Sequence, residues 1–204
     1  FRLTGVGLDI QEVEMDQLDL QGELDWPALR IRSAHVQFKD GAVAVAHLQF
    51  NAITHQVSEG KLRLDGSIGH KFLPPEISYK HISLTGEFFG PLEKLSHSGH
   101  VELQGAKFPD LTPLGMVAEW RGRWLDLESI QGNITAKNST VAFDGAAKYG
   151  TNQMDLRVAE LALTQNGEVI LHLEKPLAIS AIQTGQTNFN VSVEPLRLTR
   201  SEER

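Results

Sequence analysis

One short pattern of apolar and polar positions recurs five times along the chain. It consists of an apolar residue, any residue, Leu or Phe, a polar residue and Gly, at 18–22, 62–66, 82–86, 101–105 and 141–145. The two apolar residues of each copy are two positions apart, so both side chains point to one face of an extended strand. We expect the Gly to end each run. Because a short repeated strand buries its apolar side only against its neighbours, the pattern predicts one long surface rather than a closed pocket.

Turn signals separate several of the alternating stretches. Lys39-Asp40-Gly41 and Asn166-Gly167 each stand between two such stretches, and each predicts a hairpin because Asn and Gly tolerate positive φ. The apolar positions change parity after the first of these turns, which predicts a bulge near Ala46 and His47.

Period-two alternation dominates the chain, and windows that fit an amphipathic helix are few and short. The predicted class is therefore all-β, an elongated, curled sheet built from repeats of short strands. The segments 69–76 and 107–115 each contain two prolines and are predicted loops or sheet-edge crossings. A dozen or more strands about 4.8 Å apart would form a rod on the order of 60 Å long. An ordinary sandwich shows the same alternation, so that alternative stays open.

No flexible linker or change of composition divides the chain, so residues 1–204 are interpreted as a single β-repeat unit. The sequence opens at Phe1 rather than Met, inside an alternating stretch. We therefore interpret it as a segment of a longer protein. No apolar stretch reaches the roughly 20 residues that span a bilayer as a helix.

Composition narrows the function classes. A hydrophobic content of 41% excludes wholesale disorder, and the formal net charge of -7 with scattered acidic residues argues against nucleic acid as a partner. The absence of cysteine removes disulfides, thiolate nucleophiles and zinc ribbons. The chain has no Gly-x-Ser-x-Gly elbow, and its acidic residues alternate with apolar ones as on the wet side of a strand. His97 and His100 form a close pair without supporting ligands and fit a solvated turn better than a metal site. We expect no enzyme, no metal and no cofactor.

The segment Trp120-Arg121-Gly122-Arg123-Trp124 is the most unusual pentapeptide. The favoured interpretation is a hairpin turn at Gly122 with tryptophans that shield a sheet edge. In the alternative, Arg121 and Arg123 lie at the rim of a groove and hold a phosphate head group.

Two stretches carry a resemblance to a known family. Gly86 to Leu95 followed by Gly99 to Gly105 resembles the phrase G-x-x-x-G-P-L-x-x-L then G-x-V-x-L-x-G of the TamB (translocation and assembly module) family, a relative of the AsmA-like proteins. Glu174 to Ile179 followed by Phe189 to Leu198 resembles a second phrase of that family. The resemblance covers most of 18–198, and its phrases are β-repeats rather than catalytic signatures.

The resemblance implies a taco-shaped sheet with a hydrophobic concave groove, located in the bacterial periplasm and attached to the inner membrane through a segment outside this chain. It implies phospholipid as cargo and an outer-membrane barrel of the Omp85 type as partner. The paired apolar residues are then expected to line the groove and carry acyl chains between the two membranes: Leu18, Leu20, Leu62, Leu64, Ile82, Leu84, Val101, Leu103, Leu125, Leu127, Val141, Phe143, Leu161, Leu163, Val169, Leu171 and Leu173.

Two other functions stay open. An assembly scaffold would lend its open strand edges to nascent outer-membrane proteins by β-augmentation. A structural repeat rod would fill its groove with its own side chains.

Overall fold

The computed structural model describes residues 1–10, 13–39, 41–67, 78–108, 112–183 and 189–200. Apart from one single-turn 3-10 helix, the regular structure of these residues is β-strand. In chain order the elements are β1 (Arg2–Ile10), β2 (Val13–Asp25), β3 (Ala28–Phe38), β4 (Val43–Asn51), β5 (Gln56–Gly66), β6 (His81–Pro91), η2 (Leu92–Lys94), β7 (Ser96–Ala106), β8 (Leu114–Arg123), β9 (Asp126–Ala136), β10 (Ser139–Tyr149), β11 (Gln153–Gln165), β12 (Glu168–Leu173), β13 (Leu177–Gln183), β14 (Phe189–Val193) and β15 (Leu198–Arg200).

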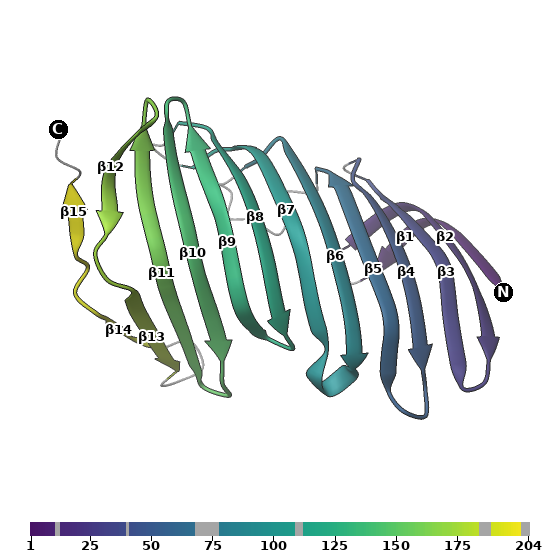
Figure 1. The fold of residues 1–204 in the computed structure, drawn as a ribbon. Helices are drawn as coiled ribbons and strands as arrows, with labels where there is room; N and C mark the ends of the chain where they lie inside the picture. The colour runs from purple at the N-terminus through teal and green to yellow at the C-terminus, as the bar shows by residue number, and fades with distance from the viewer. Residues whose placement is uncertain (11–12, 40, 68–77, 109–111, 184–188, 201–204) are drawn as a thin grey trace.

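The strands form a single antiparallel sheet of 15 strands, which confirms the predicted all-β class. From β1 to β12 each strand pairs with the next one in the sequence, so the chain is a long meander of hairpins (Figure 1). At the C-terminal end β11 is shared, because Gln153–Val158 pairs with β13 and Ala162–Gln165 pairs with β12. Strands β14 and β15 then pair with β13 and β12. Both predicted hairpins, β3–β4 and β11–β12, are present.

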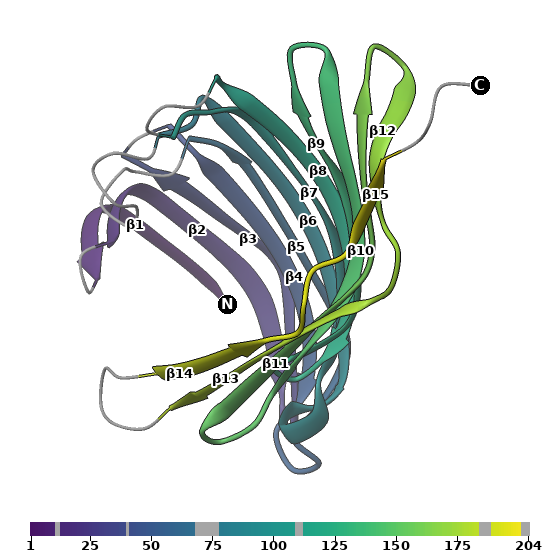
Figure 2. The same ribbon diagram turned by 90° about the vertical axis from the view of Figure 1, so that its left-hand side faces the viewer.

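The sheet is one layer thick and curled. Figure 2 shows the strands bowed, so that the sheet forms an open trough with a concave and a convex side. The accessible surface is 13973 Å², whereas a compact monomer of this mass exposes about 9,500 Å². Among the described residues the buried hydrophobic side chains are small: Ala42, Val57, Ala106, Ala118 and Ala147. A sandwich would bury large side chains between its layers, and that alternative is therefore wrong.

The repeat glycines differ from expectation. Gly66 is the last residue of β5, but Gly22, Gly86 and Gly145 lie inside strands, and Gly105 is the next-to-last residue of β7. The pairing register shifts at Gly22 and at Gly145. A register shift of this kind bends and twists a strand without ending it. These two glycines thus mark bends in continuous strands.

The bulge predicted near Ala46 and His47 is at that place, but its extra residue is on the partner strand. Ile31 pairs with Leu48 and Ala34 with Ala46, so two residues of β3 oppose His47. The predicted loop 69–76 lies outside the described residues, and 109–111 of the second predicted loop does so too.

Candidate functional site

The registers of the ladders place apolar side chains in rows that cross the sheet. One row joins ten successive strands, from β2 to β11, and contains no polar side chain: Leu18, Val36, Ala44, Leu64, Leu84, Val101, Ala118, Gly132, Phe143 and Leu161. A second row on the same face joins β6 to β12: Ile82, Leu103, Met116, Ile134, Val141, Leu163 and Leu171. Directly opposed residues of neighbouring strands share a face, so each row is continuous.

The backbone shows on which side of the trough these rows lie. The Trp124 amide donates a hydrogen bond to the Leu95 carbonyl oxygen. Because hydrogen-bonded pairs alternate along an antiparallel ladder, Val101 and Leu103 also direct their N–H and C=O groups toward β8. In Figure 1 β7 runs upward with β8 on its left. An L-residue on an upward strand, with its N–H and C=O groups pointing left, directs its side chain away from the viewer. The far side in Figure 1 is on the left in Figure 2, where the sheet is concave. We call it the inner face.

Fifteen of the seventeen residues predicted to line a groove lie on this inner face. They belong to the two rows above or to flanking positions of the same parity: Leu18, Leu20, Leu62, Leu64, Ile82, Leu84, Val101, Leu103, Leu127, Val141, Phe143, Leu161, Leu163, Leu171 and Leu173. Most are half-buried rather than covered.

Two predicted groove residues are placed elsewhere. Leu125 belongs to the turn between β8 and β9, where its side chain is 60% exposed. Val169 is opposite Thr164, on the other face of the sheet, because the register shifts between Leu163 and Thr164. In both cases a local irregularity of the backbone breaks the alternation on which the prediction depended.

The inner face also contains residues outside the repeat pattern. Trp120 lies opposite Gly99, and its ring lies over Gly99 and within 3.9 Å of a Cβ built at the neighbouring Gly86. Phe88 covers Gly60 in the same way. Aromatic rings that lie across glycines of a neighbouring strand fill space that a Cβ would occupy. In the sequence, such a pair is an aromatic residue on one strand and a glycine on the next. It can be recognised only when the pairing register of the two strands is known.

The arginines of the unusual pentapeptide lie on the other face. Gly122 is inside β8, and the turn falls two residues later at Trp124, which has a positive φ of 55°. Arg121 is opposite Ser98, and Arg123 comes within 3.7 Å of Glu128. Neither guanidinium belongs to the inner face. The predicted turn position is therefore wrong, and Trp120 covers glycines of the inner face instead of a sheet edge.

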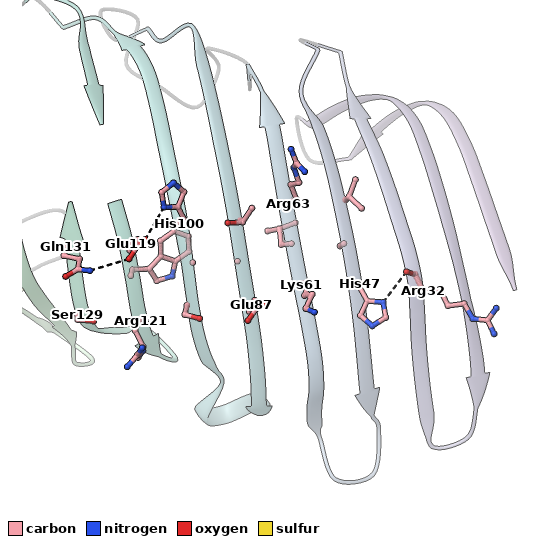
Figure 3. A pocket seen from close by; sticks show the side chains of 18 residues that line it. Arg32, His47, Lys61, Arg63, Glu87, His100, Glu119, Arg121, Ser129 and Gln131 are labelled. Atoms are coloured by element: carbon pink, nitrogen blue, oxygen red, sulfur yellow. Dashed lines mark hydrogen bonds and ion pairs between the residues drawn. The ribbon is translucent and has the colours of Figure 1, made fainter. Parts of the chain in front are cut away.

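The convex side, which we call the outer face, is polar. It carries an open hollow of about 830 Å³ whose lining includes Lys61, Arg63, Glu87, His100 and Glu119 (Figure 3). His100 Nδ1 lies 3.8 Å from Glu119 Oε1 across the β7–β8 ladder, and Lys61 Nζ forms an ion pair at 3.0 Å with Glu59 Oε1 within β5. The hydrogen bond from Lys61 is the main cause of the lowered pKa of Glu59.

The described residues contain no group of three or more His, Asp or Glu side chains arranged to hold a metal. The turn predicted for His97 and His100 is wrong, because both residues lie inside β7, and they lie on opposite faces since they are three positions apart. His97 Nε2 is 3.0 Å from the Trp124 carbonyl oxygen. The residues that the structure describes form no helix with the length and hydropathy of a membrane span.

The fold and the site together define a class: an open, one-layer antiparallel sheet with an apolar concave face and a polar convex face. No model of a protein family, no curated protein and no solved structure matches the chain.

Proposed function

We propose that the inner face binds the acyl chains of phospholipids, and that the chain is part of a non-enzymatic conduit along which lipids move. The observation that carries this proposal is the apolar row that crosses ten strands on the concave side without a polar side chain. Burying an acyl chain against such a surface contributes about 0.8 kcal/mol per CH₂. At about 4.8 Å per strand, ten strands give a path of roughly 45 Å.

The surplus of accessible surface supports the same proposal. An apolar face without a second layer leaves hydrophobic area in water, and a large exposed apolar patch is typical of a ligand or partner surface. A lipid tail is a suitable occupant because an acyl chain forms no directional hydrogen bonds. Moving it from one strand to the next exchanges one set of aliphatic contacts for an equivalent one, and no polar group has to be desolvated.

On the basis of the sequence resemblance to the TamB family, we propose that the conduit lies in the periplasm. There it would be attached to the inner membrane outside this segment, with an Omp85-type barrel in the outer membrane as partner. The outer face suits this arrangement, since ion pairs such as Lys61–Glu59 stay in contact with water while the inner face holds the lipid.

Photo-crosslinking tests the proposal. A photoreactive residue at Leu84 or Leu103, in the centre of the inner face, should capture phospholipid when the protein is isolated from bacterial membranes. The same probe at Thr85 or Gln104, one position along each strand and exposed on the outer face, is the matched control. Absence of lipid at both inner positions, with protein of normal fold, would contradict the proposal.

A scaffold for β-barrel assembly is the second candidate, and the free edge of β1 favours it. Among the described strands β1 pairs only with β2, which leaves one row of its N–H and C=O groups available to an added strand. Crosslinks from β1 to client polypeptide, combined with none from Leu84 to lipid, would favour this function. A structural rod would give neither product.

A further inference from the structure

The turns along one margin of the sheet carry large exposed apolar side chains. Strands β2, β4, β6, β8 and β10 all end at this margin, the lower one in Figure 1, and each is followed there by a short connection. Every one of these five connections presents at least one such side chain in the turn or within two residues of the strand end: Leu24 and Trp26, Ile53, Phe89 and Leu92, Trp124 and Leu125, and Tyr149. We call this set the aromatic margin.

The opposite margin has different turns. Three short hairpin turns there contain Lys39 and Gly41, Lys137 and Asn138, and Asn166 and Gly167, and the described parts of two longer connections contain Tyr79 and Phe108, which are half-buried. The three hairpin turns are polar, and the exposed large apolar side chains within two residues of a strand end at this margin are Val45 and Val169, at 41% and 44%, among the described residues. Among the described residues, exposed aromatic side chains thus occur at the turns of one margin and not at those of the other.

The exposure of the aromatic margin is not a by-product of chain reversal. Trp26 is 71% exposed and Trp124 is 59% exposed. A turn does not need tryptophan, and Trp124 even occupies a positive-φ position that Asn or Gly would adopt at lower cost. Two of the chain's three tryptophans are therefore in water, at places where local structure gives no reason for them.

We propose that the aromatic margin docks on the surface of a phospholipid bilayer. Trp and Tyr rings, with an apolar body and a polar tip, prefer the interface between water and acyl chains. Turns at the same margin are about 10 Å apart, since two strands separate them, so five turns make a row of about 40 Å. Separate side chains on successive turns can each enter a lipid interface. A protein partner would require a continuous packed patch.

The bilayer in question is a zwitterionic one. The chain has a formal net charge of -7, and the aromatic margin has a mixed set of charges, with Asp25, Glu93 and Asp126 beside Lys94 and Arg123. Anionic lipid would repel the molecule as a whole. Insertion of apolar side chains is independent of lipid charge, and the proposed contact is therefore hydrophobic.

The experiment measures partitioning onto phosphatidylcholine vesicles by co-sedimentation. The double variant Trp26→Ser/Trp124→Asn should partition at least tenfold less than the wild type. Both side chains are exposed, so the fold should persist, as far-UV circular dichroism can check. The matched control is Val45→Ser/Val117→Ser, which removes two 41% exposed apolar side chains from the outer face and should leave partitioning unchanged.

Fluorescence provides a second measurement. In variants with Trp26 or Trp124 as single tryptophan, vesicles should shift the emission to the blue, and brominated lipid should quench it. Equal partitioning of wild type and Trp26→Ser/Trp124→Asn, unshifted emission, or binding that requires anionic lipid would each overturn the docking proposal. None of these results affects lipid capture at Leu84, so failure here and failure of the conduit are distinguishable.

Discussion

The inner and outer faces of this sheet are built by the same strands, one residue apart. Beside the apolar inner row runs an outer row, each member adjacent in sequence to an inner one: Asp19, His35, Val45, Arg63, Thr85, His100, Glu119, Gln131, Asp144 and Glu160. The outer side chains find partners within the sheet. Arg2 Nη2 is 2.6 Å from Asp19 Oδ2, and this hydrogen bond lowers the pKa of Asp19.

The inner side chains have no comparable partners. Neighbouring strands provide contact at the sides, but the part of the chain that the structure describes has no second layer over Leu84 or Val101. The outer side chains therefore interact with one another and with water, whereas an apolar molecule that covers the inner face lowers the free energy by removing apolar surface from water. In the proposed function, alternation without a second layer is what gives one sheet both a structural face and a binding face.

The largest predicted effect comes from reversing the chemistry of the inner face. The double variant Leu84→Glu/Leu103→Glu should lose at least nine-tenths of its captured phospholipid, because an acyl chain that covers a carboxylate removes it from water without a compensating partner. Lipid extracted from the purified protein and measured by mass spectrometry provides the readout.

Its matched control puts the same two charges on the outer face. Thr85→Glu/Gln104→Glu should retain lipid at the wild-type level, since both positions are already in water. Equal loss in the two double variants would show that added charge, rather than the inner face, determines lipid capture. Both variants should keep the wild-type far-UV circular dichroism.

A second prediction concerns the Trp120 ring on the inner face. Gly99→Ala should lower the free energy of unfolding by about 1–3 kcal/mol, because the new Cβ would collide with the Trp120 ring and the Thr85 carbonyl oxygen. Gly86→Ala, directly across the ladder, should change it by less than 1 kcal/mol, since its Cβ would have its nearest neighbours at 3.8 and 3.9 Å. Urea denaturation measures both, and similar losses would refute the role of the Trp120 ring.

The sequence contains enough to predict the class of fold and most of the inner face. Pairs such as Leu62 with Leu64 and Val101 with Leu103 keep their parity because no bulge intervenes, and both pairs lie where alternation puts them. Val169 is misplaced because one extra residue, Ile170, shifts the register of β12 relative to β11. A single-residue slip has no signature in composition or hydropathy.

Other parts of the site depend on information that a linear pattern does not hold. Ala44 and Ala118 complete the apolar row, yet small residues add little to an apolar pattern. Trp120 over Gly99 is a pair across two strands, so it emerges only from the register. The curl that turns one face into a trough depends on register shifts such as the one at Gly145, where the sequence pattern predicts the end of a strand.

The smallest predicted effect is on the outer face, at the junction of β11 and β13. The Ser180 hydroxyl donates to Asp155 Oδ1 at 2.6 Å, and Gln153 Nε2 donates to the same carboxylate at 2.9 Å. These bonds lower the pKa of Asp155. A group whose pKa is lower in the folded state stabilises the protein above its unfolded pKa, about 3.9 for Asp, and this contribution is lost as the pH falls through the folded value.

Ser180→Ala should therefore lower the Tm slightly at pH 7, and the difference from wild type should shrink as the pH falls below about 4. Ser192→Ala is the matched control, because Ser192 pairs with Ser180 across the β13–β14 ladder but is exposed. Lipid capture should be unchanged in both variants, since the Asp155 carboxylate lies on the outer face. A loss of bound lipid in Ser180→Ala would mean that the two faces are coupled through β13, and the separation between a structural and a binding face would fail at this end of the sheet.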